Sequence, residues 1–397
     1  MKNNPETRLE EFVDEWSVDS ASNIFSIESD KGYPELPVLS ASQELGMVKR
    51  DNIGIDMQYS KQNITSYKRV KPGRFVIHLR SFQGGFAHSA IEGITSPAYT
   101  VLSLKEPQKH DDYFWKYLFT SPEFVKRLEL VTYGIRDGRS ISVDDFFNLP
   151  FCYPSTAEEQ HKIAQFFSRL DSLITAEDKK LERLKTIKSA SLEKMFPKQG
   201  ETVPEVRFKG FTGEWMESRI GDCFSERKER SGIGEMLSVT INSGVRKARE
   251  LDRTVHIGDT SNYKVVRQGD IAYNSMRMWQ GASGYSQYDG IVSPAYTVII
   301  PNERIDSRFF ACLFKTQYMI HVFELNSQGL TSDTWNLKYG QLRSIPVRYP
   351  VDVKEQIYIA EYFSRLDTLI SAQEQKIGKL RSLKKSFLEK MFVSTPK

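Results

Sequence analysis

The second half of the chain repeats the first, and this repeat constrains the fold more than any other feature of the sequence. The segment Glu159–Ile174 reappears as Glu355–Ile370, and Leu192–Phe196 reappears as Leu388–Phe392, both after the same interval of 196 residues. The constant interval means that the register holds without a gap between the two segments. A repeat of this kind indicates that one structural unit occurs twice, so we expect two equivalent halves.

The stretches in front of these segments correspond more loosely. Ser96–Val101 is matched by Ser293–Val298, and Arg8–Phe12 is similar to Arg207–Phe211. The chain is therefore predicted to contain two copies of a variable module, each followed by a nearly constant helical module. We place these modules at residues 1–150, 151–200, 201–346 and 347–397.

Each variable module is predicted to combine strands and helices. Ser96–Leu102 and Ser293–Ile300 are rich in Val, Ile, Thr and Tyr and are bounded by Gly and Pro, which is typical of strands. Asp111–Glu129 and Asp306–Leu325 carry apolar residues at helical spacing. An Asp stands where it would cap the start of each helix.

The constant modules are predicted to be helical, with an internal break. The Ser-x-x-Asp pattern of Ser168–Asp171 and Ser364–Asp367 resembles a helix start, so a short helix over about 158–167 should precede a longer one over about 169–195. About 27 residues at ~1.5 Å each give roughly 40 Å, close to the ~34–36 Å of one turn of duplex DNA. The apolar stripes predict that the two long helices form an antiparallel coiled pair. The apolar positions assigned to this packing, and to partner binding beyond it, include Leu170, Leu181, Leu184, Leu366, Leu380 and Leu383.

The overall charge alone does not indicate a function. The 55 Lys and Arg residues against 51 Asp and Glu residues give a net charge of +4, whereas DNA binding depends on local charge. Between residues 46 and 91 eight basic residues face only two acidic ones, while residues 1–45 carry three basic and ten acidic residues. The basic stretch suits phosphate contact, and an ordinary solvated loop region explains it about as well.

The sequence shows neither a membrane segment nor a disulfide framework. No window reaches the ~18 consecutive apolar residues of a membrane span, and the start of the chain lacks the apolar core of a signal peptide. A cytoplasmic location is therefore expected. Cys152, Cys223 and Cys312 are widely spaced, which predicts buried thiols.

Four stretches of the sequence resemble a known family: Gly269–Gly281, Gly290–Tyr296, the pair Glu355–Gln356, and Phe208–Trp215. Over essentially its whole length, the chain resembles the specificity subunit of a type I restriction-modification system. The resemblance implies an α+β fold in which two mixed α/β target-recognition domains alternate with two long-helix conserved regions, in a pseudo-twofold repeat. It also implies that each domain reads one half of a bipartite target in double-stranded DNA, and that the partners are two adenine-N6 methyltransferase subunits and the restriction (motor-nuclease) subunits.

The first module departs from the family pattern. Arg74–Gly85 replaces the run that the second module carries at Tyr273–Gly281, so the two half-sites are expected to differ. The resemblance implies a non-catalytic chain without a cofactor of its own, with S-adenosylmethionine, ATP and Mg on the partner subunits. The sequence likewise shows no Gly-rich loop for S-adenosylmethionine and no phosphate-binding loop for ATP.

The candidate DNA-contacting residues are those whose side chains can make bidentate contacts to base edges or bind phosphates. At this stage, a loop with a buried Trp279 and a solvated Arg277 remains the alternative for the second module. The second-module candidates are Asn274, Ser275, Arg277, Trp279 and Gln280, with Thr331, Ser332 and Asn336 as a further set. The first-module candidates are Lys68, Arg69, Arg74, His78, Arg80 and Gln83, with Arg136 and Arg139 near a Gly-rich turn.

No residue pattern for catalysis competes with this interpretation. The six His residues lack metal-ligand spacing, so no metal site is expected. The pairs Asp111–Asp112 and Asp144–Asp145 are interpreted as helix-start charges rather than a nuclease site. Two other functions stay open: a coiled-coil scaffold that binds proteins and not DNA, and a cryptic metal-dependent nuclease in the first module.

Overall fold

The computed structural model describes residues 4–53, 61–134, 139–251, 259–331 and 334–393, and it divides the chain into two compact units. Unit 1 combines Met1–Asp178 with Gln375–Lys397, and unit 2 is Lys179–Glu374. The two long helices, α6 (Ala157–Lys194) and α11 (Val353–Lys390), therefore each contribute one part to each unit. The expected module boundaries follow the sequence repeat, whereas the compact units divide the chain within these helices.

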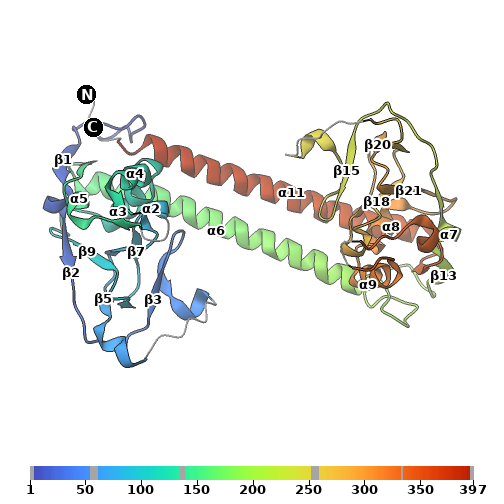
Figure 1. The fold of residues 1–397 in the computed structure, drawn as a ribbon, viewed down its shortest axis with the longest axis horizontal. Helices are drawn as coiled ribbons and strands as arrows, with labels where there is room; N and C mark the ends of the chain where they lie inside the picture. Colours follow the sequence, from blue (N-terminus) through green and yellow to red (C-terminus); the bar gives the residue numbers. More distant parts are fainter. Residues whose placement is uncertain (1–3, 54–60, 135–138, 252–258, 332–333, 394–397) are drawn as a thin grey trace. The chain divides into compact units, whose positions relative to one another are not determined.

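A four-stranded antiparallel sheet forms the centre of each variable module (Figure 1). The strand order is β2-β9-β6-β7 in unit 1 and β14-β21-β18-β19 in unit 2. The shared order confirms the repeat and the mixed α/β modules that the sequence predicted. The strands are β2 Phe25–Glu28, β9 Thr100–Leu104, β6 Arg74–Ile77 and β7 Ala87–Ser89 in unit 1, and β14 Phe224–Glu226, β21 Tyr296–Pro301, β18 Ile271–Asn274 and β19 Ser283–Tyr285 in unit 2.

Two-stranded antiparallel pairs surround each of these sheets. In unit 1 they are β1 (Ser17–Ser20) with β12 (Pro150–Tyr153), β3 (Leu39–Ser42) with β4 (Gly46–Lys49), β5 (Lys68–Val70) with β8 (Gly93–Thr95), and β10 (Thr132–Tyr133) with β11 (Ser140–Ile141). In unit 2 they are β13 (Met216–Arg219) with β22 (Pro346–Tyr349), β15 (Leu237–Thr240) with β16 (Gly244–Lys247), and β17 (Lys264–Val266) with β20 (Gly290–Val292).

Each helix predicted for the variable modules is divided into two. Helices α3 (Asp112–Thr120) and α4 (Pro122–Leu128) replace the single helix expected in unit 1, because Ser121 caps a new helix that begins at Pro122. Helices α8 (Ser307–Leu313) and α9 (Gln317–Asn326) do the same in unit 2, with Thr316 as the cap. The predicted Asp caps are confirmed, since Asp111 accepts a hydrogen bond from the Phe114 amide at 2.9 Å and Asp306 accepts one from Arg308 at 2.8 Å.

Short helices complete the two modules. The second predicted acidic pair, Asp144 and Asp145, lies in the first turn of α5 (Val143–Phe147), where the sequence predicted helix-start charges. In unit 1 the short helices are α1 Ala21–Ile24, η1 Arg50–Ile53, η2 Lys61–Ser66, α2 Ser81–Gly84, η3 Glu129–Val131 and α5 Val143–Phe147. In unit 2 they are α7 Ile220–Cys223, η5 Ala248–Glu250, η6 Met278–Gln280 and α10 Tyr339–Leu342.

The predicted break in the constant modules is wrong, because α6 and α11 are each one helix of 38 residues. At ~1.5 Å per residue each is about 57 Å long, not roughly 40 Å. In unit 1, Phe167 and Leu170 lie on both sides of the expected break, and both are buried. Phe167 stacks on Phe392 with ring centroids 5.8 Å apart. Keeping both side chains in one apolar face requires a continuous helical turn, which outweighs the local capping signal at Ser168.

Within each unit the parts of α6 and α11 pack antiparallel. In unit 1, Asp171 pairs with Lys384 at 2.5 Å and Glu177 pairs with Lys376 at 2.5 Å, so the numbering rises along one helix and falls along the other. In unit 2, the ion pairs Lys185–Glu374 and Lys188–Asp367 run in the same antiparallel sense. The predicted antiparallel pairing is confirmed in both units.

A buried glutamate at the start of each long helix locks the helix to the segment that leads into its module. Glu159 is 2% exposed and accepts two hydrogen bonds from Arg8 at 2.7 Å. In unit 2, Glu355 is 1% exposed and accepts two from Arg207, at 2.7 and 2.8 Å. The same pair of side chains therefore performs the same structural task in both halves of the chain.

The next residue, a buried glutamine, joins each long helix to its variable module. The Gln160 amide oxygen accepts from the Asp111 amide at 3.0 Å, and its nitrogen donates to the Pro154 carbonyl at 3.0 Å. Gln356 makes the equivalent bonds in unit 2, to Asp306 and to the Pro350 carbonyl, both at 2.9 Å. The repeated Glu-Gln pair of the sequence therefore has the same structural role in both units.

Cys152 and Cys223 are buried as predicted, and Cys312 is half-buried. Burial raises the pKa of Cys152 and of Cys223 to about 11. Among the described residues, no helix combines the length and the apolar character needed to cross a membrane.

Candidate nucleic-acid interface

One loop occupies the same place in the central sheet of each module. Residues 78–86 connect β6 to β7 in unit 1, and residues 275–282 connect β18 to β19 in unit 2. We call them reading loop 1 and reading loop 2. A glycine with positive φ lies near the end of each loop, Gly85 at +78° and Gly281 at +82°. The two loops therefore differ in their side chains, although each joins the equivalent pair of strands and has a positive-φ glycine near its end.

Reading loop 2 presents Arg277 from a framework of internal hydrogen bonds. Asn274 accepts from the Met276 amide at 3.0 Å, and the Trp279 indole donates to the Met276 carbonyl at 3.1 Å. The Trp279 ring packs edge-on against Trp335 at 5.2 Å. The Arg277 side chain is exposed, and no ion pair involves it in the part of the chain that the structure describes. Its guanidinium is therefore available for a bidentate contact to a base.

Three other second-module candidates, Ser275, Gln280 and Asn336, are buried or half-buried. Ser275 is 6% exposed and its hydroxyl lies 2.8 Å from that of Thr297, so it supports the loop instead of offering a donor to DNA. Asn336 is half-buried and its backbone pairs with Gln328. Gln280 is half-buried at the end of η6. Thr331 is exposed, whereas Ser332 lies outside the described residues.

Three basic residues predicted to contact DNA in the first module are engaged within the module. Lys68 donates to the Tyr99 carbonyl at 2.6 Å. Arg69 pairs with Glu92 at 2.5 Å and with Asp30 at 3.4 Å, and Arg74 pairs with Glu28 at 2.5 Å; these acidic partners come from residues 28–30 and 92. Acidic residues of the leading segment therefore neutralise part of the basic stretch in the fold.

The remaining first-module candidates gather around reading loop 1. Arg80 and Gln83 are exposed, and the exposed Arg139 places its guanidinium 5.8 Å from the centre of the Phe82 ring. His78 is half-buried, and burial, followed by the charge of Arg80, lowers its pKa. Arg136 lies outside the described residues. Reading loop 1 therefore offers Arg80 and Gln83 to a ligand, and Arg139 lies against the Phe82 ring of the same loop.

Sequence reasoning missed the hairpin turns that accompany the reading loops. In unit 1 the turn between β3 and β4 brings the Gln43 amide to 3.5 Å from the side-chain oxygen of Gln83. In unit 2 the turn between β15 and β16 exposes Asn242 and Ser243. The Asn-Ser-Gly run at residues 242–244, between two β-branched segments, is the hairpin signal that could have revealed this turn.

The apolar positions assigned to partner binding fall into two groups. Leu170, Leu181 and Leu366 are buried within the units, which makes them packing residues and leaves nothing for a partner to cover. Leu184 and Leu380 are half-buried, and Leu383 is 47% exposed. The exposed apolar side chains recur at repeat-related positions: Leu173 and Leu383 in unit 1, Leu369 and Ile187 in unit 2.

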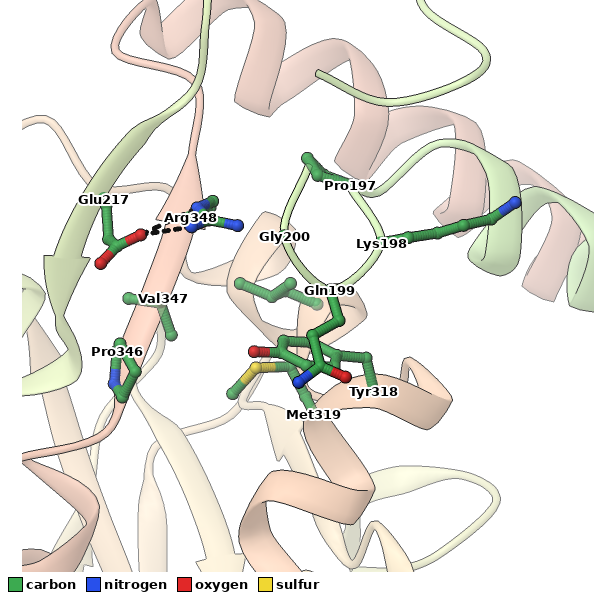
Figure 2. A pocket seen from close by; sticks show the side chains of 11 residues that line it. Pro197, Lys198, Gln199, Gly200, Glu217, Tyr318, Met319, Pro346, Val347 and Arg348 are labelled. Carbon is green, nitrogen blue, oxygen red and sulfur yellow. Dashed lines mark hydrogen bonds and ion pairs between the residues drawn. The ribbon is translucent and has the colours of Figure 1, made fainter. Parts of the chain in front are cut away.

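A cavity in unit 2 lies between the linker that follows α6, helix α9 and strand β22 (Figure 2). Its charged side chains are already paired, since Arg348 binds Glu217 at 2.5 Å and Lys198 binds Glu205 at 3.5 Å. None of the predicted DNA-contacting residues lines it. The cavity therefore offers little to an anionic ligand, and the reading loops remain the better candidate.

One protein-family model matches both halves of the chain. The model described as type I restriction modification DNA specificity domain matches residues 14–186 and 213–382. The S subunit of a type I restriction-modification system from M. genitalium has a similar structure, with 15% identity, coverage of 99% of this chain and 100% of that chain, and a TM-score of 0.60.

A second solved structure, described as "Structural basis underlying complex assembly and conformational transition of the type I R-M system", covers 95% of this chain and 97% of that chain, with 14% identity and a TM-score of 0.55. At these identities the likeness to both solved structures shows the fold. A sequence comparison with curated proteins gives no match.

Proposed function

The chain belongs to the family of type I restriction modification DNA specificity domains, and from this premise we propose that its two modules read the two halves of an asymmetric, bipartite target in double-stranded DNA. Reading loop 1 and reading loop 2 are the proposed base-contacting elements. The asymmetry follows from their different side chains, because Arg80 and Gln83 in one loop and Arg277 in the other offer different hydrogen-bond donors and acceptors to base edges.

The observation that carries this proposal is an exposed arginine in each reading loop that forms no ion pair with any described residue. The neighbouring basic residues Arg69 and Arg74 are bound by carboxylates, whereas Arg80 and Arg277 are exposed without an ion pair among the described residues. Arginine is the commonest side chain for a bidentate contact to guanine. The equivalent position of both loops in their sheets makes them the parts of the two modules best suited to the same task.

Sequencing methylated adenines in cells with and without the chain tests the proposal. The expected result is a two-part motif that disappears when the chain is absent. Arg277→Ala should relax one half of the motif by ~1–3 kcal/mol per lost bidentate pair, and Arg80→Ala should relax the other half. If the chain together with its methyltransferase shows no salt-dependent affinity for DNA, the protein is a scaffold and the proposal is wrong. Metal-dependent cleavage by the isolated chain would instead reveal a nuclease.

We propose that the repeat-related apolar side chains of the long helices bind two methyltransferase subunits, one at each unit. Leu173 and Leu383 in unit 1 have their counterparts in Leu369 and Ile187 of unit 2, which suits two copies of one partner. S-adenosylmethionine, ATP and Mg are proposed to bind to the methyltransferase and restriction subunits, with the present chain non-catalytic. Leu173→Asp combined with Leu369→Asp should release the methyltransferase in a pull-down assay, and unchanged capture would contradict this assignment.

The long helices are further proposed to set the gap between the two half-sites. Inserting four residues between Leu181 and Leu192, and at the repeat-related place in α11, should lengthen the gap in the methylated motif. Neither half-site should change, because the insertion leaves both modules intact. An altered half-site in the sequenced motif would count against this role.

A further inference from the structure

A half-buried lysine, Lys315, joins two separate segments of the second module. Lys315 follows α8, and its ammonium donates to the Ile241 carbonyl at 2.7 Å and also to the Gly281 carbonyl. Ile241 belongs to the turn between β15 and β16, which we call the unit 2 turn (Ile241–Ser243), and Gly281 lies near the end of reading loop 2. One ammonium group therefore bridges a hairpin turn and a reading loop.

The ammonium is kept at this place although the surroundings disfavour its charge. Burial, and then the nearby Lys188 of α6, lower the pKa of Lys315 to about 8, and Asp367 of α11 and Cys312 of α8 partly oppose that shift. A cation that is partly removed from water is expected to have specific hydrogen-bond partners. Its partners here are the Ile241 and Gly281 carbonyls, which supports the interpretation that Lys315 links the hairpin turn to the reading loop.

Close backbone packing holds the hairpin against the strand that follows reading loop 2. A Cβ atom on Gly284 of β19 would lie 2.7 Å from the Gly244 Cα and 2.9 Å from the Val245 nitrogen. No side chain fits into that approach, so β16 lies directly on β19. Two contacts therefore fix the position of the unit 2 turn: the glycine packing of β16 on β19, and the hydrogen bond from Lys315 to the Ile241 carbonyl.

The unit 2 turn carries chemistry suited to reading a base. Ile241, Asn242 and Ser243 are all exposed, and an Asn amide can make a bidentate contact to adenine. Arg246, further along the hairpin, is exposed and has no ion pair among the described residues. The turn therefore offers hydrogen-bonding groups, and Lys315 joins it to Gly281 of reading loop 2, the loop that carries Arg277.

The first module makes the same connection with different residues. There the Gln43 side chain of the β3–β4 turn contacts reading loop 1, where a Cβ on Gly84 would lie 2.8 Å from the Gln43 Cγ. Reading loop 1 also rests on the end of α3, since a Cβ on Gly85 would lie 1.8 Å from the Phe119 carbonyl oxygen. Both modules therefore fix a hairpin turn to a reading loop, and they do so by unrelated contacts.

We propose that the unit 2 turn is a second base-reading element of the second module, and that Lys315 is a positioning residue that holds it in register with reading loop 2. This inference rests on the proposed function and deepens it. It means that discrimination at one half-site depends on the relation between two segments about 30 residues apart in the sequence, and not on the reading loop alone.

The test uses the full chain assembled with its methyltransferase subunits. Methylation rates are measured on duplexes that carry single base changes in either half-site. Asn242→Ala should reduce discrimination roughly 5- to 150-fold at one or two positions of the second half-site, without affecting the first. Gln43→Ala is the matched variant of the other module, and its effect should be confined to the first half-site.

Lys315→Met separates positioning from direct phosphate contact. The variant keeps the length of the side chain and removes the ammonium, so discrimination should fall at the positions affected by both Asn242→Ala and Arg277→Ala. The salt dependence of DNA affinity should stay unchanged, because no phosphate contact is lost. If the slope of log affinity against log salt concentration falls in magnitude by about 1, Lys315 is a phosphate ligand and the positioning role is wrong. Intact discrimination at the first half-site shows that the variant chain is folded.

The failure of this inference is distinguishable from the failure of the proposed function. If Arg277→Ala relaxes the second half-site while Asn242→Ala leaves all positions unchanged, the turn does not read bases and the proposed function stands. If the assembled complex shows no sequence preference at all, the proposed function itself is wrong. Because Asn242 is exposed, the first of these outcomes does not depend on the stability of the variant.

Discussion

The buried glutamates at the starts of the long helices give a prediction with an internal control. Glu159→Ala removes one partner of an ion pair whose side chains are 12% and 2% exposed. Removing one member of a buried pair costs about 3–5 kcal/mol, because the other charge stays buried without its partner. For a unit of about 200 residues, 1 kcal/mol corresponds to ~2–4 °C in Tm. Glu159→Ala should therefore lower the Tm of unit 1 by roughly 6–20 °C.

The repeat-related variant Glu355→Ala should be less damaging. Arg207 also donates to the carbonyls of Gly213 and Thr212, at 2.6 and 3.2 Å, so its guanidinium keeps acceptors. Glu159, in contrast, is the only hydrogen-bond acceptor of Arg8 among the described residues, and it also accepts from the Trp16 indole at 3.1 Å. An extra buried donor left unpaired costs about 1–3 kcal/mol, and the two variants should differ by that amount.

The assay is thermal unfolding of the full chain. Calorimetry monitors the unfolding, so that the two units give separate signals. Trp16→Phe in the wild-type and in the Glu159→Ala background forms a double-mutant cycle that isolates the indole hydrogen bond. The reasoning is refuted if both glutamate variants lower the Tm equally, or if Glu159→Ala lowers it by less than about 2 °C.

Three further predictions concern other parts of the chain. Gly85→Ala should destabilise unit 1 more than Gly200→Ala destabilises unit 2 in the same thermal assay, because only Gly85 faces a carbonyl oxygen, at 1.8 Å from the added Cβ, although φ is positive at both positions; equal effects would contradict the packing argument. Lys68→Met should leave the salt dependence of DNA affinity unchanged, because its ammonium binds the Tyr99 carbonyl; a slope smaller by about 1 would show a phosphate contact. Cys152 and Cys223 should react with a thiol reagent at pH 7.5 far more slowly in the native protein than in urea, because burial raises the pKa of both to about 11 and the thiolate is the reactive form; rapid native labelling of either would show that it is accessible.

The sequence was sufficient for the features that depend on pattern and spacing. The repeat of Glu159–Ile174 predicted equivalent halves, and the apolar stripes of the long helices predicted an antiparallel pair. The Asp caps at positions 111 and 306 were found as predicted. The helix break at Ser168 was wrong because a local capping signal cannot show that Phe167 and Leu170 share one buried face. Local sequence weighs short-range hydrogen bonds, whereas packing against distant residues decided the outcome.

The candidate interface was harder to predict because side-chain type does not reveal the partner. Arg69, Arg74 and Arg80 look alike in the sequence, yet only Arg80 escapes the carboxylates at Glu28, Asp30 and Glu92. The pairing of Arg74 with Glu28 depends on the sheet, in which only β9 separates β2 from β6. The role of Lys315 likewise requires a hairpin turn more than 70 residues away in the sequence.

The assignment of Gln375–Lys397 to unit 1 has a consequence for synthesis on the ribosome. Leu388, Met391 and Phe392 are buried in the same apolar core as Phe167, and the Lys390 carbonyl accepts from the Thr7 amide at 3.0 Å. The core of unit 1 therefore cannot be completed until the last residues have been translated. At ~5–20 residues per second, this takes roughly 10–40 s after residue 178 has been added. During that interval the core lacks Leu388, Met391 and Phe392. A chain whose synthesis stops early therefore has an incomplete first module, even if its second module has folded.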